Sequence, residues 1–321
     1  MRHRHTRTFI ARRSILLGAA CFAAAAASPV LAQSLPRVTM GVIAKDGSAI
    51  VPTLLTDDKA LQQQFGVQVE AKAYPSVTAV WTAFAAGEFD FLIGGPAGFV
   101  GLVEKGVPIH LMATYSISSA QIFGAGKRIE SAADLRGKRV TAVVAGLWKL
   151  TEAQIKAKWG LAPGAGYELI PVPNLMAGVT QVLAGTADYA MGWEPDATRV
   201  RQTYPTLKLA LSSEDLRPAG EPSIIQVIGS KNSITADVQK KAADALAAMS
   251  DKVTKDPVAA EAKFASMTGA EKGAFAEAVK TGRYQLTVRL LNAPDKALLK
   301  ADILKTMPPN AVVPPKLLDR S

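Results

Sequence analysis

The residues with the clearest chemical meaning lie in short turns between apolar segments and helical ones. They are Ser48, Ser76, Gly95, Pro96 and Asn174. The first turn of a helix leaves backbone N–H groups unpaired, and the helix dipole adds partial positive charge there, so each such turn favours an anion by about 0.3–1 kcal/mol. A sulfonate, carboxylate or nitrate can be held in this way without any arginine. The same residue types also serve as helix caps alone, so both roles remain open.

Four larger side chains stand where predicted strands end, namely Tyr115, Trp148, Trp193 and Glu194. The aromatic rings suit the walls of a cleft that accepts the apolar part of an organic ligand, but they suit a packed core equally well. Glu194 suits an amine on the ligand, or a hydrogen bond that braces a hinge. Asp90 and Asp188 begin strands after Ala-Gly turns, so we interpret both as structural.

The first 32 residues have the pattern of a secretory signal peptide. Five arginines up to Arg13 precede the apolar run from Ile15 to Val30, and Ala32 ends the segment. The apolar run is too short for a membrane span of about 20 residues. Arg12-Arg13 resembles a twin-arginine export signal, ordinary secretion remains an alternative, and Cys21 raises the less favoured alternative of a lipoprotein. The sequence thus predicts export to the periplasm.

Without this leader the composition excludes several classes of function. The five arginines of the leader account for part of the charge, so the net charge falls from +10 to +5. This balance does not indicate a nucleic-acid partner. Cys21 is the only cysteine, and His110 is the only histidine outside the leader. We therefore expect no disulfide, no Cys/His metal site, no cofactor and no thiol nucleophile, and we do not expect an enzyme.

Apolar strands and helical stretches alternate along the remaining chain. The predicted strands are 38–44, 67–73, 89–93, 107–113, 139–145, 168–172, 188–191 and 223–229. The predicted helices are 49–64, 77–86, 96–105, 174–184, 235–254 and 257–267, followed by a polar helical tail to Ser321. This alternation predicts an α/β fold with mostly parallel strands, whose ligand lies beyond the carboxyl ends of the strands.

A structural unit recurs at a constant offset of 98 positions. Pro75 corresponds to Pro173, and Ala86-Gly87 to Ala184-Gly185; further matches are Ala79 with Ala177, Asp90 with Asp188, Phe91 with Tyr189 and Gly94 with Gly192. Seven matches in one register predict the same loop–helix–strand unit used twice, once in each of two lobes.

Three motifs in this order resemble the nitrate/sulfonate/taurine-type substrate-binding proteins of ABC transporters. They are 85–90 followed by 94–96, 131–140, and 183–189 followed by Trp193-Glu194-Pro195. The resemblance implies a two-lobed periplasmic binding protein of type II-like fold, in which two crossover strands, near 116–124 and 221–229, join two α/β lobes. It divides the chain into lobe 1, at 35–120 plus 225–321, and lobe 2, at 121–224.

The resemblance also implies a function and partners. The lobes would close on a small solute, which an ABC permease with its ATPase subunits would then receive, and the binding protein would be a monomer. A sensor subunit that presents the ligand to a membrane receptor is an alternative, and an enzyme on the same fold is a less favoured one. The sequence gives no ligand identity within the family's range.

Overall fold

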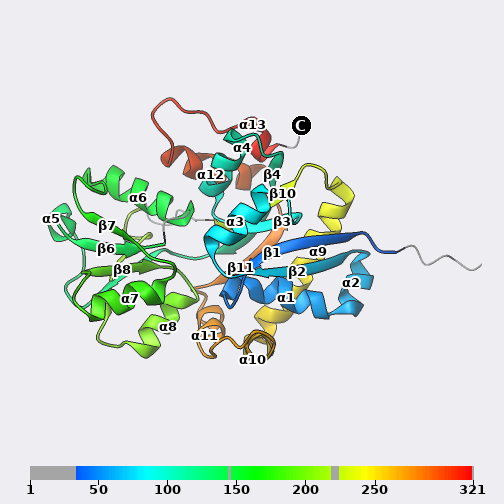
Figure 1. Cartoon of the computed structure of the whole chain (residues 1–321), viewed down its shortest axis with the longest axis horizontal. Coiled ribbons are helices and arrows are strands. Elements are labelled where there is room, and N and C mark those ends of the chain that lie inside the picture. Colours follow the sequence, from blue (N-terminus) through cyan, green and yellow to red (C-terminus); the bar gives the residue numbers. More distant parts are fainter. Residues whose placement is uncertain (1–33, 144–145, 218–223, 320–321) are drawn as a thin grey trace, which may run out of the picture. The chain divides into compact units, whose positions relative to one another are not determined.

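The computed structural model describes residues 34–143, 146–217 and 224–319, so the predicted signal peptide lies outside the described residues. From Leu35 onward the chain forms one compact unit that contains two β-sheets (Figure 1). Within the described ranges, no helix has both the length and the apolar character needed to cross a membrane.

The first sheet has six strands in the order β11-β4-β10-β3-β1-β2. Their bounds are β1 Arg37–Ile43, β2 Gln68–Tyr74, β3 Phe91–Gly94, β4 Ile109–Ile117, β10 Ile224–Lys231 and β11 Gln285–Leu290. β1 pairs in parallel with both β2 and β3, whereas β10 runs antiparallel to β3 and β4. The carboxyl ends of β1 to β4 therefore share one edge of the sheet.

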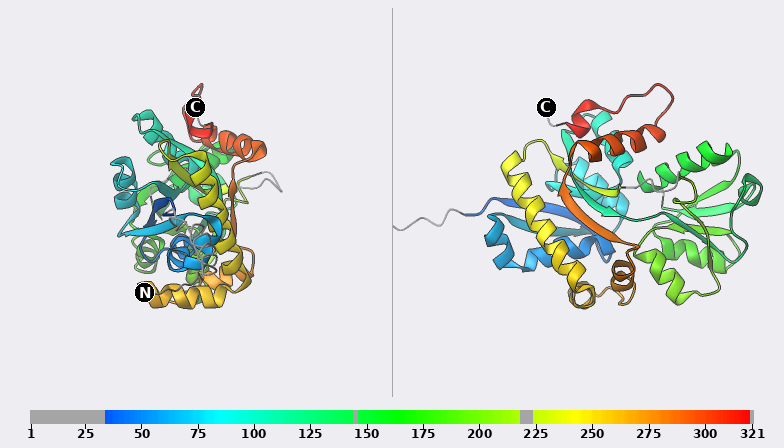
Figure 2. Two further views of the ribbon diagram at one scale, coloured as in Figure 1. Left: turned by 90° about the vertical axis from the view of Figure 1, so that its right-hand side faces the viewer. Right: turned by 180° about the vertical axis from the view of Figure 1, so that it is seen from behind.

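Helices cover both faces of this sheet and enclose two cores. One face carries η1 Gly47–Ala49, α1 Ile50–Asp57, α2 Lys59–Phe65, α9 Ala236–Lys255, α10 Pro257–Thr268 and α11 Phe275–Lys280. The other face carries α3 Val77–Ala85, α4 Pro96–Glu104, α12 Ala293–Lys305 and α13 Pro315–Leu318. Figure 2 shows α9, in yellow, along one face of the sheet. Alternate side chains of β3 divide between the cores, because Phe91 and Ile93 enter one core and Leu92 enters the other.

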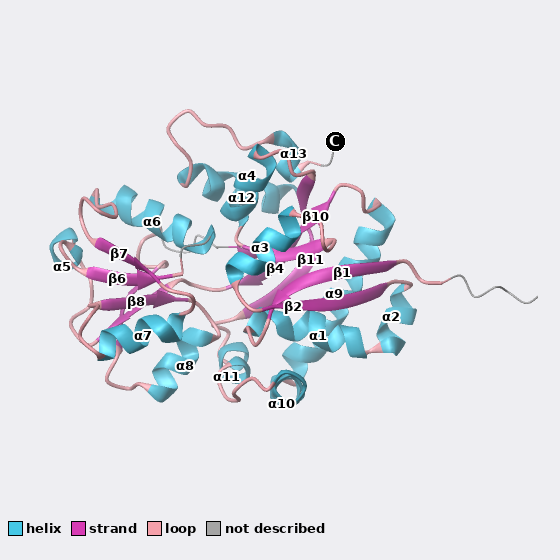
Figure 3. Cartoon of the chain, in the orientation of Figure 1, coloured by secondary structure: helices cyan, strands magenta, loops and turns pink. Residues whose placement is uncertain are grey.

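The second sheet has five strands in the order β7-β6-β8-β5-β9 (Figure 3). Its strands are β5 Gln121–Gly124, β6 Arg139–Ala142, β7 Glu168–Pro171, β8 Tyr189–Gly192 and β9 Lys208–Ser212. Its helices are α5 Ala132–Leu135, α6 Gly146–Trp159, α7 Leu175–Leu183 and α8 Asp196–Thr203. Side chains of α6 contribute to one core, and those of α7 and α8 to the other. β6 is parallel to β7 and β8, whereas β5 is antiparallel to its neighbours.

β4 leads through 118–120 into β5 and so connects the first sheet to the second. The chain returns to the first sheet between β9 and β10, where 218–223, and with them the start of the crossover predicted near 221–229, lie outside the described residues. The fold is thus the two-lobed α/β architecture expected from the sequence. Both sheets are mixed: most strands of each run in one direction, but β10 and β11 in the first sheet and β5 in the second run antiparallel to their neighbours.

Two predicted elements differ from the structure. The helix expected over 49–64 is broken at Asp58, because the Asp58 carboxylate accepts the N–H of Leu61 at 2.9 Å and begins α2 anew. The tail expected to be helical contains β11, which pairs antiparallel with β4 at the edge of the first sheet. The strand β9 and the helices α6 and α8 were not predicted, whereas β5 falls within the crossover strand expected near 116–124.

Candidate ligand-binding region

The carboxyl-end turns of the two sheets meet at Gly47 and Pro195. A side-chain carbon added to Gly47 would collide with the ring of Pro195, so the turn after β1 lies directly against the turn after β8. On either side of this contact, α4 packs against α6, and α8 against α11. The turns that the sequence predicts for ligand binding therefore come from sheet edges that face one another.

Of the three predicted polar residues, two act as helix caps and Ser48 does not. Asp46 is instead the N-cap of η1, and its carboxylate accepts the N–H of Ser48 at 2.8 Å and also its hydroxyl hydrogen, which fixes the turn before α1. Ser76 accepts the N–H of Ala79 at 3.2 Å at the start of α3. Asn174 accepts the N–H of Ala177 at 2.9 Å at the start of α7. Each cap satisfies one N–H and leaves the other N–H groups of its first helical turn for water or a ligand.

Gly95 and Pro96 form the turn between β3 and α4. Gly95 is the N-cap of α4 and provides no capping side chain, and Pro96 occupies the first turn. The indole ring of Trp81 packs over this turn, because a side-chain carbon on Gly94 would lie 2.5 Å from Trp81 Cζ2. Trp81 is partly exposed and packs on Phe99 at 4.7 Å between ring centroids. The sequence analysis did not name Trp81 as a site residue. Its position, just over one turn into the helix that follows Ser76, could have indicated that it lies near the predicted site.

Two predicted aromatic residues lie in the cores. Tyr115 is fully buried in β4, its hydroxyl donates to the carbonyl oxygen of Ser48, and burial raises its pKa well above the ordinary value. Trp148 is also fully buried, and its ring meets Tyr167 edge-on with 6.2 Å between centroids. Tyr115 therefore braces the turn after β1 through Ser48, whereas Trp148 is part of the core beside the second sheet.

Trp193 and Glu194 follow β8. Trp193 is partly exposed, whereas the Glu194 side chain is buried. Glu194 accepts the N–H of Thr198 and the Nε2–H of Gln121, both at 2.9 Å, and forms an ion pair with Arg201. Because Gln121 opens β5 directly after the crossover, Glu194 ties the turn after β8 to the base of the crossover.

An acidic cluster lies at the meeting point of the two sheets. Burial, together with the nearby carboxylates of Asp46 and Glu194, raises the pKa of Asp196 to about 7, against the lowering effect of Arg199. Arg199 in α8 also forms an ion pair with Glu271, which precedes α11. Among the described residues no group of histidine, cysteine, aspartate or glutamate is arranged to hold a metal ion. The region therefore offers N–H groups, hydroxyls and partly exposed indoles as its binding groups.

The fold and this arrangement define a periplasmic binding protein. A family model described as the periplasmic substrate-binding protein of phosphonate ABC transporters matches residues 58–286. The chain therefore belongs to this family of transporter subunits, which agrees with the resemblance found in the sequence. No curated protein matches the chain.

Solved structures of sulfonate-binding proteins share the fold. The alkanesulfonate-binding protein SsuA from Xanthomonas axonopodis pv. citri, solved with MOPS, is 17% identical with a TM-score of 0.67, over 88% of this chain and 97% of its own. The aliphatic sulphonate binding protein SsuA from Escherichia coli is 14% identical with a TM-score of 0.63, over 83% and 85%. The sulfonate-binding protein SsuA from Methylobacillus flagellatus is 16% identical with a TM-score of 0.62, over 89% and 92%.

Proposed function

We propose that the protein captures a small organic or inorganic solute that carries an oxyanion group, such as a sulfonate, a phosphonate, taurine or nitrate, between its two lobes. The observation that carries the proposal is the convergence of helix N-termini. α3 and α4 begin at the carboxyl edge of the first sheet, and α6 and α7 begin at the carboxyl edge of the second. These edges face one another at the Gly47–Pro195 contact. Helix N-termini that converge on one space favour a negative charge without a dedicated cation.

Trp81 and Trp193 give the site its apolar part. Both rings are partly exposed, and they belong to opposite sheets. An organic anion with a short alkyl or aryl group matches this pairing of N–H donors and indole faces, as the names of the sulfonate-binding structural neighbours also suggest. Ligand held by one lobe gains contacts from the other, which shifts the equilibrium between open and closed forms.

The closed form is the species that a membrane permease would receive. Under this proposal the protein is exported by way of residues 1–32, acts as a monomer, and delivers its ligand to a permease driven by ATPase subunits. Lobe 1 comprises 35–120 plus 225–321 and lobe 2 comprises 121–224, so that each lobe is built on one of the two sheets. The nine residues from the sequence analysis act as caps, supports or contacts of this site.

Thermal unfolding of the purified protein with a ligand panel tests the proposal. The panel contains alkanesulfonates, taurine, methylphosphonate, nitrate, bicarbonate and aromatic carboxylates. A ligand at a hundredfold excess over its dissociation constant adds about 2.7 kcal/mol of stability. We expect one anion class to raise the melting temperature and to be recovered unchanged. If no compound shifts the transition, the small-anion proposal is wrong, and chemically altered ligand would indicate an enzyme.

Ala97→Glu places a carboxylate in the first turn of α4, where Ala97 is partly exposed. A glutamate there suits the helix but repels an anion, and about 1.4 kcal/mol of repulsion weakens binding tenfold. Val258→Glu is the matched control, because Val258 also follows a first-turn proline, in α10, and is 51% exposed. We expect only Ala97→Glu to reduce ligand affinity, and equal affinities of the two variants would remove α4 from the site.

A further inference from the structure

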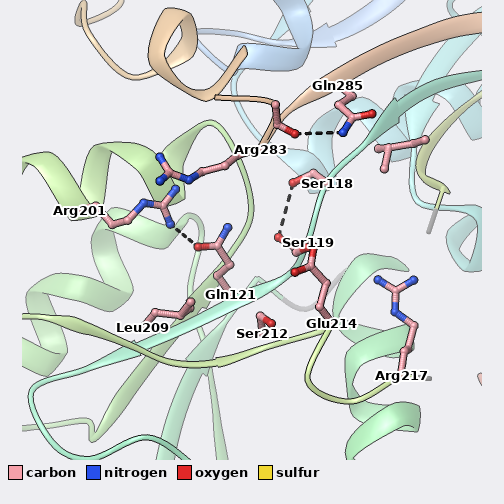
Figure 4. Close-up of a pocket in the computed structure, with 12 residues that line it drawn as sticks. Ser118, Ser119, Gln121, Arg201, Leu209, Ser212, Glu214, Arg217, Arg283 and Gln285 are labelled. Atoms are coloured by element: carbon pink, nitrogen blue, oxygen red, sulfur yellow. Dashed lines mark hydrogen bonds between the residues drawn. The ribbon is translucent and has the colours of Figure 1, made fainter. Parts of the chain in front are cut away.

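A separate cavity of about 350 Å³ lies at the crossover between the sheets. Its walls come from the segment after β4, from β9 and the turn that follows it, from α8 and from the residues before β11 (Figure 4). None of its lining residues belongs to the turns after β1, β2, β3, β6, β7 or β8 that the proposed function uses. The cavity therefore requires its own explanation.

Three arginines and one carboxylate line this cavity, namely Arg201, Arg217, Arg283 and Glu214. The Glu194 ion pair neutralises Arg201. Neither Arg217 nor Arg283 forms an ion pair with a described residue. Glu214 accepts the hydroxyl hydrogen of Ser119, and no described cation pairs with it either. With Arg201 neutralised, the lining holds two further arginines and one glutamate, so its net charge is positive.

The donors of the lining have spare hydrogen-bonding capacity. Among the described residues, Arg217 bonds to Ser213 alone, from Nε at 3.3 Å and from Nη2 at 3.5 Å, both longer than the usual distance of about 2.9 Å. Its Nη1 is buried without a partner among the described residues. Among the described residues, the Ser118 hydroxyl donates one hydrogen bond, of 3.5 Å, to the Ser119 carbonyl oxygen. Exposed Arg283 has no hydrogen-bond partner in the described ranges.

We propose that this cavity is a second anion site, specific for a tetrahedral oxyanion such as phosphate, sulfate or the headgroup of a phosphonate or sulfonate. A planar guanidinium matches two oxygens of such an ion, and Arg283, which has no carboxylate partner among the described residues, offers such a fork beside the guanidinium of Arg201 (Figure 4). The Ser118 hydroxyl supplies a neutral donor. The volume lies within the usual range of about 300–1,000 Å³ for small-molecule sites.

The position of the cavity links ion binding to the arrangement of the two sheets. Arg283 precedes β11 of the first sheet, whereas Arg201 belongs to α8 beside the second sheet, and their guanidinium groups lie next to one another (Figure 4). An ion held at these two groups would contact both sides of the crossover. Its binding is then linked to the relative orientation of the sheets, and the linkage is reciprocal.

Isothermal titration of the purified protein at low ionic strength, with inorganic phosphate, sulfate, methylphosphonate and methanesulfonate, tests the proposal. Arg283→Gln is the main variant, because an exposed side chain without a partner is replaced at little cost to folding. We expect it to weaken phosphate and sulfate binding at least tenfold, whereas Arg217→Gln, on the far side of the cavity, should weaken binding less. Arg136→Gln, an exposed arginine of the second lobe outside the cavity, is the control and should bind as the parent does.

Ala97→Glu separates this site from the proposed transport site. We expect phosphate binding to persist in Ala97→Glu and to be lost when Arg283→Gln is added. Binding that is lost in Ala97→Glu but unchanged in Arg283→Gln would place the ion in the transport site and overturn the proposal. Absence of any phosphate or sulfate binding would overturn it as well, without bearing on the transport ligand. Comparison of the inorganic ions with the two methyl compounds shows whether a free ion or a ligand headgroup fits better.

Discussion

The Asp188 carboxylate accepts the backbone N–H of Arg139 at 2.8 Å, which joins the start of β8 to the start of β6. Asp90 does the same in the first sheet, where it accepts the N–H of Thr39 at 2.8 Å between β3 and β1. The repeat found at an offset of 98 therefore corresponds to one structural device used in both sheets. Both aspartates are structural, as the sequence analysis interpreted them.

Asp188→Asn should lower the free energy of unfolding by about 1–2 kcal/mol, because a hydrogen bond to a charged group is worth more than one to a neutral amide. Asp90→Asn should have a similar effect for the same reason. Asp244→Asn is the control, since Asp244 forms only an exposed i,i+4 pair with Lys240. Urea unfolding measures all three, and losses no larger than that of the control would contradict a structural role.

The effect of Asp188 should also depend on pH. Burial raises its pKa, but the N–H and guanidinium of Arg139 outweigh burial, so the pKa lies below the usual 3.8. A lowered pKa in the folded state stabilises the protein above pH 3.8, and this contribution is lost as the pH falls through the folded pKa. The difference between parent and Asp188→Asn should therefore shrink in acid, and a difference that grows in acid would refute the assignment.

Asp196 should have the opposite dependence. Its folded pKa of about 7 exceeds the ordinary 3.8, so the folded state binds more protons than the unfolded state between these values. Stability should then fall as the pH rises from about 4 to about 7, and the loss should be complete above that. Asp196→Asn should flatten this part of the curve. Urea unfolding at several pH values checks it, and parallel curves for parent and variant would contradict the raised pKa.

The sequence predicted most of the fold because the signals were local. Ser76 and Asn174 cap the helices they were expected to begin, and Gly66 ends α2 with a positive φ of 66°. The strands that the sequence analysis did not predict depend on partners that are distant in the chain, since β11 pairs with β4 across more than 160 residues. No local pattern reveals such pairing.

The same reason explains the two aromatic residues found in the cores. Tyr115 was expected just beyond a strand ending at Ala113, but pairing with β10 and β11 extends β4 to Ile117 and places Tyr115 inside the sheet. Trp148 lies in the first turn of α6, which the sequence analysis did not predict, and its ring is in the core. Trp81 differs from these two aromatic residues. It was not predicted to be a site residue, yet it remains partly exposed beside Gly94.

Removal of Glu194 should be more harmful than its neutralisation. Glu194→Ala leaves Arg201 without its partner and Thr198 N–H without an acceptor, and should cost about 2–4 kcal/mol. Glu194→Gln keeps an acceptor for Thr198 and should cost less. Chemical unfolding distinguishes the two variants, and equal losses would show that the charge alone matters.

Two glycines of α4 should respond in opposite directions to alanine. A side-chain carbon on Gly101 meets nothing within 4 Å, so Gly101→Ala should raise the free energy of unfolding by about 0.5–1 kcal/mol through helix propensity. A carbon on Gly98 would lie 2.6 Å from Trp81 Cη2, and the ring must move. Overpacking of this kind costs about 1–3 kcal/mol, which outweighs the gain in propensity.

Gly98→Ala should therefore destabilise the protein, and the displaced Trp81 ring should also alter ligand affinity if it lines the site. Urea unfolding gives the first quantity and titration with the ligand found in the panel gives the second. Because both substitutions lie in one helix, one turn apart, Gly101→Ala controls for any general change in α4. Stabilisation by both variants would show that Trp81 moves freely, and the indole would then be a poor candidate for a fixed wall of the binding site.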